Sequence, residues 1–171
     1  MSLSIAVAGG TLTKTCASQS SKGKNFLCLV FWLGDLVRNM ERGIETFREA
    51  FYNEGARDLA VRDTAYAVLG PNDYEGDASR EDALQRLERA LERMGLSRSD
   101  ARLSWDAGRN VAELRIRLRS ARVVAKSSSS QRDVDRNIHA LALWLQTKAK
   151  NYERGLESDM EMLFAANLLP A

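Results

Sequence analysis

The clearest pattern in this chain is the stretch VDRNIHALALWLQTKAKNY, residues 134–152. Apolar residues recur in it at intervals of four, three, four, four and three: Val134, Ile138, Leu141, Leu145, Ala149 and Tyr152. An α-helix turns once in about 3.6 residues, so this spacing places the six side chains on one face of a helix. The stretch therefore predicts a long amphipathic helix.

The same spacing occurs upstream in residues 26–66, where the apolar stripe is Leu29, Trp32, Leu36, Met40, Ile44 and Phe47. Gly55 interrupts the pattern, which resumes over residues 56–69. A glycine between two helical patterns is typical of a turn. The segment therefore predicts two antiparallel helices joined at Gly55, or a single kinked helix.

Two further helices are expected in the middle of the chain. Ser79 has the position of a helix N-cap, and the apolar stripe that follows it ends at Gly95, as helices often do. Residues 73–101 carry a net charge of −3, so this helix is expected to be acidic and solvated. Val111, Leu114 and Leu118 are spaced by three and four and predict a third principal helix.

These patterns predict an all-α protein, an up-and-down four-helix bundle with extended termini and one extra acidic helix. The chain has only two prolines in 171 residues, which suits long helices. We expect a single domain with these parts: an N-terminal arm (1–24), a first helix pair (25–69), an acidic insert helix (73–101), a second helix pair (104–152) and a C-terminal segment (153–171). The arm starts like a short strand, and we expect it to be loose or ordered against a neighbouring subunit.

Composition argues against several classes of protein. The net charge of +2 excludes a polycation, and Cys16, Cys28 and the lone His139 leave no Cys/His zinc site and no disulfide scaffold. The chain has no G-x-S-x-G, P-loop or G-x-G-x-x-G motif, so we expect no enzyme and no cofactor. The most apolar run, residues 26–33, is too short to span a membrane, which needs about 20 residues. A cytosolic protein is expected.

Arginine outnumbers lysine 19 to 6, and in a bundle several basic residues would meet at one end. This end would join the third helix, the serine-rich loop, the start of the fourth helix and the turn near Gly55. The residues that would meet there are Arg57, Arg119, Arg122, Lys126, Arg132 and Arg136. Arginine binds phosphate in a bidentate manner, so the cluster predicts a phosphate site. Alternatively, the arginines form internal ion pairs with Asp133 and Asp135, which could also orient arginines, accept from ribose or cap the helix.

The chain resembles the coat proteins of rod-shaped, positive-strand RNA plant viruses of the tobacco mosaic virus type. The resemblance follows the chain in order through five motifs: Met1-Ser2-Leu3-Ser4-Ile5; Trp32 with Gly55-Ala56-Arg57-Asp58-Leu59; Arg109-Asn110-Val111-Ala112-Glu113-Leu114 with Arg119-Ser120-Ala121-Arg122; Arg132-Asp133-Val134-Asp135; and Tyr152-Glu153-Arg154-Gly155-Leu156-Glu157. The resemblance implies a capsid subunit that assembles with identical subunits into a helical rod around single-stranded genomic RNA, in the virion and in the host cytoplasm.

The resemblance also implies the roles of the site residues. Arg57, Arg119, Arg122 and Arg132 would face the phosphates, Asp135 would lie against ribose, and Arg136 belongs to the same cluster. Two alternatives remain open: a small helical RNA-binding accessory subunit of a ribonucleoprotein complex that forms no rods, and a regulatory adaptor whose acidic segment 73–101 binds a basic partner.

Overall fold

The structure is a computed structural model that describes residues 1–7, 10–45 and 79–159. These residues form three α-helices: α1 (Lys22–Glu41), α4 (Arg80–Arg93) and α5 (Val134–Glu153). They also form two antiparallel sheets. One pairs β1 (Ser2–Val7) with β2 (Gly10–Thr15); the other has the order β3 (Ala101–Asp106), β4 (Val111–Arg117), β5 (Val123–Ser128), and the short 3-10 helix η2 (Arg98–Asp100) precedes it. The prediction of an all-α four-helix bundle is therefore wrong.

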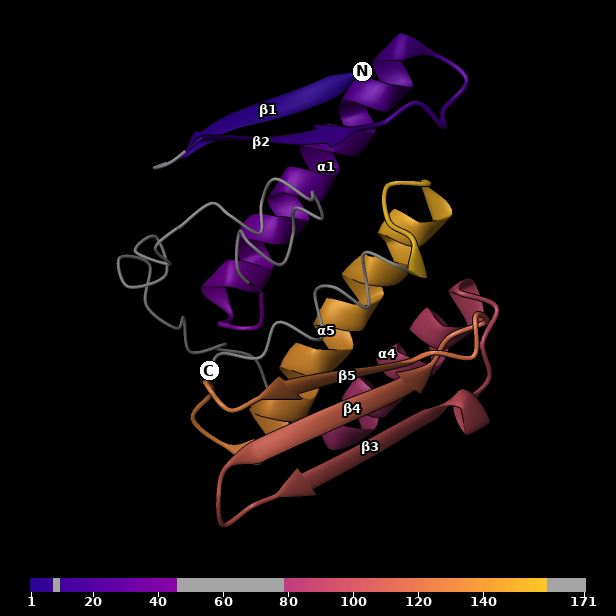
Figure 1. The fold of residues 1–171 in the computed structure, drawn as a ribbon. Coiled ribbons are helices and arrows are strands. Elements are labelled where there is room, and N and C mark those ends of the chain that lie inside the picture. The colour runs from indigo at the N-terminus through magenta and orange to yellow at the C-terminus, as the bar shows by residue number, and fades with distance from the viewer. Residues whose placement is uncertain (8–9, 46–78, 160–171) are drawn as a thin grey trace.

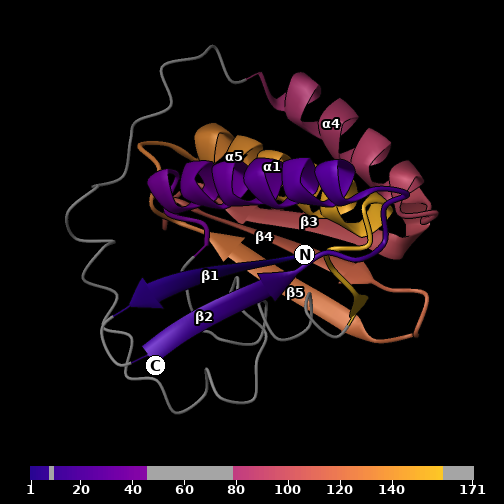
Figure 2. The same cartoon turned by 90° about the horizontal axis from the view of Figure 1, so that it is seen from above.

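The described elements form two layers (Figure 1). The helices α1, α5 and α4 lie side by side in one layer, and the strands of both sheets lie on one side of them (Figure 2). The sheet β3-β4-β5 packs its apolar face on α5, and α4 packs along α5. The hairpin β1-β2 lies against α1, whose buried side chains form a second, smaller core. The opposite face of the sheet β3-β4-β5 carries no described helix.

Three of the helices predicted from apolar spacing are confirmed, as α1, α4 and α5. α5 begins at Val134, and α4 follows the N-cap Ser79, whose hydroxyl accepts a hydrogen bond from the Asp82 amide. The acidic helix is amphipathic, as expected: Ala83, Leu87 and the rest of its apolar stripe are buried against α5, and Glu81 and Asp82 are exposed. The second helix of the first pair, the turn at Gly55 and the segment 160–171 lie outside the described residues.

The predicted third helix is the strand β4. Val111, Leu114 and Leu118 fit a helical spacing, but Ala112, Leu114, Ile116 and Leu118 also alternate with polar residues. These four side chains are all buried, and the intervening Arg115 and Arg117 are exposed. A period of two is the pattern of a half-buried strand. The alternation with arginine therefore decides the structure here, and the second helix pair (104–152) is replaced by three strands and one helix.

The N-terminal arm is also more ordered than predicted. The strand-like start becomes β1, and the chain returns as β2 in a hairpin that pairs Ser2 with Thr15. Leu3 and Ile5 pack against the core that contains Leu29 and Trp32. The arm therefore completes a core of its own chain, whereas it was expected to be loose or ordered against a neighbouring subunit. None of the helices described here is long and apolar enough to cross a membrane.

Candidate functional site

The sequence contains one structural unit twice, at an offset of 112 residues. The stretch NFLCLVFWLGDLVRNMERGIE (residues 25–45) aligns without a gap with NIHALALWLQTKAKNYERGLE (residues 137–157). Nine of the 21 positions are identical: Asn25/Asn137, Leu29/Leu141, Trp32/Trp144, Leu33/Leu145, Asn39/Asn151, Glu41/Glu153, Arg42/Arg154, Gly43/Gly155 and Glu45/Glu157. The helices α1 and α5 begin and end at the same positions of the repeat. Each unit is a β-hairpin followed by a helix.

The first internal contact common to both units is a buried asparagine in the first turn of the helix. The Oδ1 of Asn25 accepts from the Gln19 amide at 3.0 Å, and the Oδ1 of Asn137 accepts from the Gln131 amide at 3.1 Å. In both units the carbonyl oxygen of the side chain thus fixes the loop that enters the helix. A buried backbone amide without an acceptor is costly, so this role explains the asparagine.

A lysine and a tryptophan form the second common contact. Lys14 of β2 lies over the Trp32 ring, 5.5 Å from its centroid, and Lys126 of β5 lies over the Trp144 ring at 5.9 Å. Both tryptophans are buried. Each pair connects the hairpin of a unit to its helix by a cation–π contact.

The two units bind each other reciprocally. In the second unit's loop, the side-chain amide of Gln131 donates to the Arg42 carbonyl at the end of α1, at 2.7 Å, and Ser130 donates to the same oxygen at 3.1 Å. In the first unit's loop, Gln19 donates to the Arg154 carbonyl at the end of α5, at 3.2 Å, and so does the hydroxyl of Ser18. The helices α1 and α5 run antiparallel, so the start of each lies near the end of the other (Figure 1).

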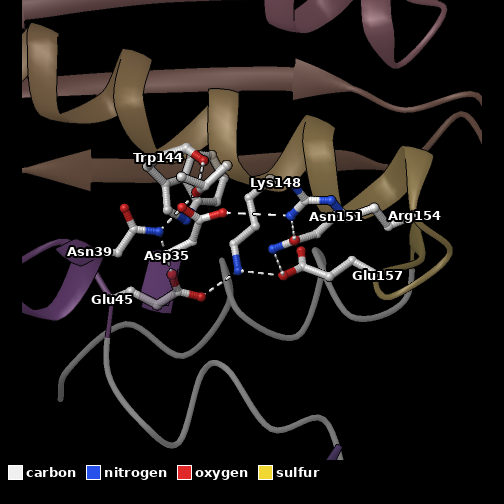
Figure 3. A network of polar contacts seen from close by, with 9 residues as sticks. Asp35, Asn39, Glu45, Trp144, Lys148, Asn151, Arg154 and Glu157 are labelled. Carbon is white, nitrogen blue, oxygen red and sulfur yellow. Dashed lines mark hydrogen bonds and ion pairs between the residues drawn. The ribbon is translucent and has the colours of Figure 1, made fainter. Parts of the chain in front are cut away.

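A buried ion cluster lies between the units (Figure 3). The Nζ of Lys148 contacts carboxylate oxygens of Glu45 and Glu157, and all three side chains are at most 4% exposed. Glu45 and Glu157 occupy equivalent repeat positions, whereas the equivalent of Lys148 is Leu36. Asn39 donates to Glu45 at 2.8 Å and Asn151 donates to Glu157 at 3.4 Å. A single lysine therefore forms ion pairs with two equivalent carboxylates, so this ion cluster does not follow the symmetry of the repeat.

The electrostatics of the cluster follow from its three buried charges. Burial lowers the pKa of Lys148, but the charges of Glu157 and Glu45 outweigh this effect and raise it. Burial raises the pKa of Glu157, the charge of Glu45 raises it further, and Lys148 opposes both. One cation cannot fully compensate two carboxylates in a low-dielectric interior, so Glu157 holds its proton more strongly than a solvated glutamate. The polar groups of this cluster satisfy one another, which is the arrangement of a structural network.

The sequence prediction did not find this centre, although a self-comparison of the chain at the offset of 112 residues reveals it. The repeat also gives one motif a structural explanation.

Residues 152–157 were matched to the coat-protein signature, but residues 40–45 carry the same pattern at the same place after a helix. Gly43 and Gly155 have φ angles of 69° and 65°, the left-handed conformation that ends a helix and favours glycine. The motif is therefore a helix C-cap of the repeated unit.

The structure separates the arginines that were predicted to converge. Arg119 and Arg122 lie in the turn between β4 and β5, at one end of β5, whereas Arg132 precedes α5 at the other end. The six residues of β5 span about 20 Å at about 3.3 Å per residue. The segment was expected to be a short loop, and as a strand it places the two groups far apart. Arg57 lies outside the described residues.

Most of the predicted site residues near α5 are used within the chain. Asp133 caps α5 by accepting from the Arg136 amide and pairs with the Arg136 guanidinium at 2.6 Å. Asp135 pairs with Arg80 of α4 at 2.6 Å, and Arg80 also lies 4.8 Å from the centre of the Trp105 ring. The hydrogen bond from the backbone amide of Arg136 lowers the pKa of Asp133 most, and the Arg136 guanidinium lowers it further. These contacts match the capping and ion-pair alternatives better than a phosphate cluster.

A different group of arginines gathers on the outer face of the sheet. Arg102 of β3 lies directly opposite Arg115 of β4 in the antiparallel register, and Ser104 lies opposite Glu113. These four residues line a pocket of about 230 Å³. Glu113 forms an ion pair with Arg115, whereas Arg102 has no ion pair with any residue the structure describes. The pocket is the candidate binding site. Sequence reasoning missed it because it treated β3 and β4 as parts of a helix pair.

No family model, no curated protein and no solved structure matches this chain. Within residues 1–7, 10–45 and 79–159, no group of three or more His, Cys, Asp or Glu side chains could hold a metal ion.

Proposed function

We propose that this chain is an RNA-binding protein that contacts RNA through the outer face of the sheet β3-β4-β5, the arginine face, defined by Arg102, Ser104, Glu113, Arg115 and Arg117. The observation that carries the proposal is the pair Arg102 and Arg115, held opposite each other in one pocket. Like charges directly opposite each other destabilise an antiparallel sheet. A phosphate between the two guanidinium groups would remove this cost and accept hydrogen bonds from both.

The other lining residues suit a nucleotide. The Ser104 hydroxyl can donate to a phosphate oxygen, and Arg117, which pairs with Asp100 at 3.0 Å, extends the row of arginines along β4. Glu113 would repel phosphate but can accept a hydrogen bond from a ribose 2′-hydroxyl, the group that distinguishes RNA from DNA. No aromatic side chain projects from this face among β3, β4 and β5 residues opposite the core, so contacts to phosphate and ribose carry binding with little sequence preference.

Of the coat-protein interpretation, RNA binding is kept and assembly into a rod is not. Binding of single-stranded RNA through arginine is retained, with the site moved to residues that the resemblance did not include. Assembly into a rod was implied by the family resemblance alone, and the described residues do not form the four-helix bundle that was predicted with it. The function we propose is therefore nearer to the accessory-subunit alternative. The helix α4 lies in the helical layer, on the other side of the sheet from the arginine face (Figure 2).

The experiment is a titration of a fluorescent uridine oligonucleotide, followed by anisotropy at several salt concentrations. The double variant Arg102→Ala with Arg115→Ala should lose affinity, and the slope of log affinity against log salt should fall by about two units, one for each lost phosphate contact. The variant Glu113→Gln should reduce the preference for RNA over the DNA oligonucleotide of the same sequence.

The matched control is the double variant Arg119→Ala with Arg122→Ala, which removes the same charge at the β4–β5 turn. It should keep most of the affinity, and circular dichroism should show all variants folded. Binding lost in the control and kept in the arginine-face variant would contradict the proposed site.

A further inference from the structure

The outer side of α1 is an exposed apolar surface, which we call the α1 face. It comprises Phe26, Leu27, Val30, Phe31 and Val37, which are 37–55% exposed. These side chains recur at spacings that keep them on one side of the helix, opposite the buried stripe of Leu29, Trp32 and Leu36. Single exposed apolar residues are ordinary, but a contiguous row with two phenylalanines is typical of an interaction surface.

The equivalent residues of the second unit show how the same face of the helix is buried there. The equivalents of Phe26, Val30 and Val37 on α5 are Ile138, Ala142 and Ala149, and each of them is 0% exposed. They are buried in the core that includes the apolar stripe of α4. The same position on the repeated unit is therefore covered by a helix in the second unit and by no described helix in the first. Among the residues that the structure describes, the α1 face is therefore the one of the two equivalent faces that stays open.

We propose that the occupant is the α1 face of a second copy of this chain, packed antiparallel to form a symmetric dimer. The face carries gaps beside its large side chains. Gly23 and Gly34 lie on it, and nothing lies within 4 Å of the position a Cβ would take at either residue. These two gaps admit large side chains of a facing helix, in the way ridges enter grooves. Two identical patches related by a two-fold axis form the commonest kind of oligomer interface.

The charges at the two ends of α1 favour the antiparallel arrangement. Lys22 and Lys24 lie in the first turn and Glu41 is the last residue of the helix. In an antiparallel pair centred between Phe31 and Gly34, each Lys24 lies beside Glu41 of the partner subunit, so the ion pair occurs twice. A parallel pair would instead place the lysines of both copies together, which costs energy.

The dimer is independent of RNA binding. The α1 face lies in the helical layer and the arginine face lies on the strand layer, so dimerisation leaves both arginine faces open. A dimer then presents two phosphate-binding faces, one on each copy of the chain.

Sedimentation equilibrium of the purified chain tests the dimer. The wild type should sediment as a dimer, and Phe31→Glu should sediment as a monomer with an unchanged circular dichroism spectrum. The matched control is Val123→Glu, since Val123 is as exposed as Phe31, at 55%, but lies on β5. Lys24→Glu should weaken the dimer, and adding Glu41→Lys should restore it.

Three results would overturn the proposal: a monomeric wild type at every concentration, a dimer that persists in Phe31→Glu, or a charge reversal that fails to restore association. A monomer that instead binds vesicles of phosphatidylcholine and phosphatidylglycerol would assign the α1 face to a lipid surface. Each of these results leaves the RNA titration unchanged, so failure of the dimer and failure of the arginine face can be told apart.

Discussion

Replacing Lys148 by methionine is expected to lower the free energy of unfolding by about 3–5 kcal/mol, because it leaves Glu45 and Glu157 buried without a cation. Methionine fills a similar volume, so the loss reports charge rather than packing. Urea denaturation followed by tryptophan fluorescence measures it. The control is Lys150→Met, on the same helix, which should change stability by less than about 0.5 kcal/mol.

The companion variant Glu157→Gln should behave in the opposite way. Burial and the Glu45 charge raise the pKa of Glu157, so the folded chain holds this proton more strongly than the unfolded chain does. The stability that this group contributes is fully present below about pH 4.5, the ordinary value for glutamate, and is lost as the pH rises through the raised value. Glutamine stays neutral, so the variant should gain stability over the wild type as the pH rises. A variant that becomes less stable relative to the wild type as the pH rises would contradict the raised pKa of Glu157.

Substitution of either of the two equivalent tryptophans should lower the free energy of unfolding by about as much as Lys148→Met. Trp32→Ala and Trp144→Ala each remove a buried indole and its cation–π partner contact, at an expected cost of about 3–5 kcal/mol. Because the two units bind each other reciprocally, each variant should unfold in a single cooperative transition, at a lower temperature than the wild type. Scanning calorimetry measures this. Two separate transitions, with only one shifted in each variant, would show that the units fold independently.

The helices could be predicted from the sequence because their burial follows one period. In α5 and α4 the apolar spacing near 3.6 residues is regular, and Ser79 gives a local capping signal. The stretch 111–118 fits two periods at once, since Leu114 and Leu118 belong both to a helical stripe and to the alternation with Arg115 and Arg117. Such a short run is ambiguous until the neighbouring strands are known.

The sites were less predictable than the helices. The arginine cluster depended on a short loop between Arg122 and Arg132, and the strand β5 fills that interval instead. The opposition of Arg102 and Arg115 depends on strand register, which no local pattern specifies. The buried Lys148 lies at a polar position of its helix and is held there by residues far away in the chain, so only the comparison of residues 25–45 with 137–157 indicates it.

Two equivalent hairpin–helix units bind each other reciprocally in this chain. Nuclear Overhauser contacts in isotopically labelled protein test this arrangement most directly. The side-chain amide protons of Gln19 should show contacts to protons of Arg154 and Gly155, and those of Gln131 should show the equivalent contacts to Arg42 and Gly43. Both sets of contacts, observed together in the wild-type protein, are the predicted result. Contacts in only one set, or in neither, would contradict this arrangement.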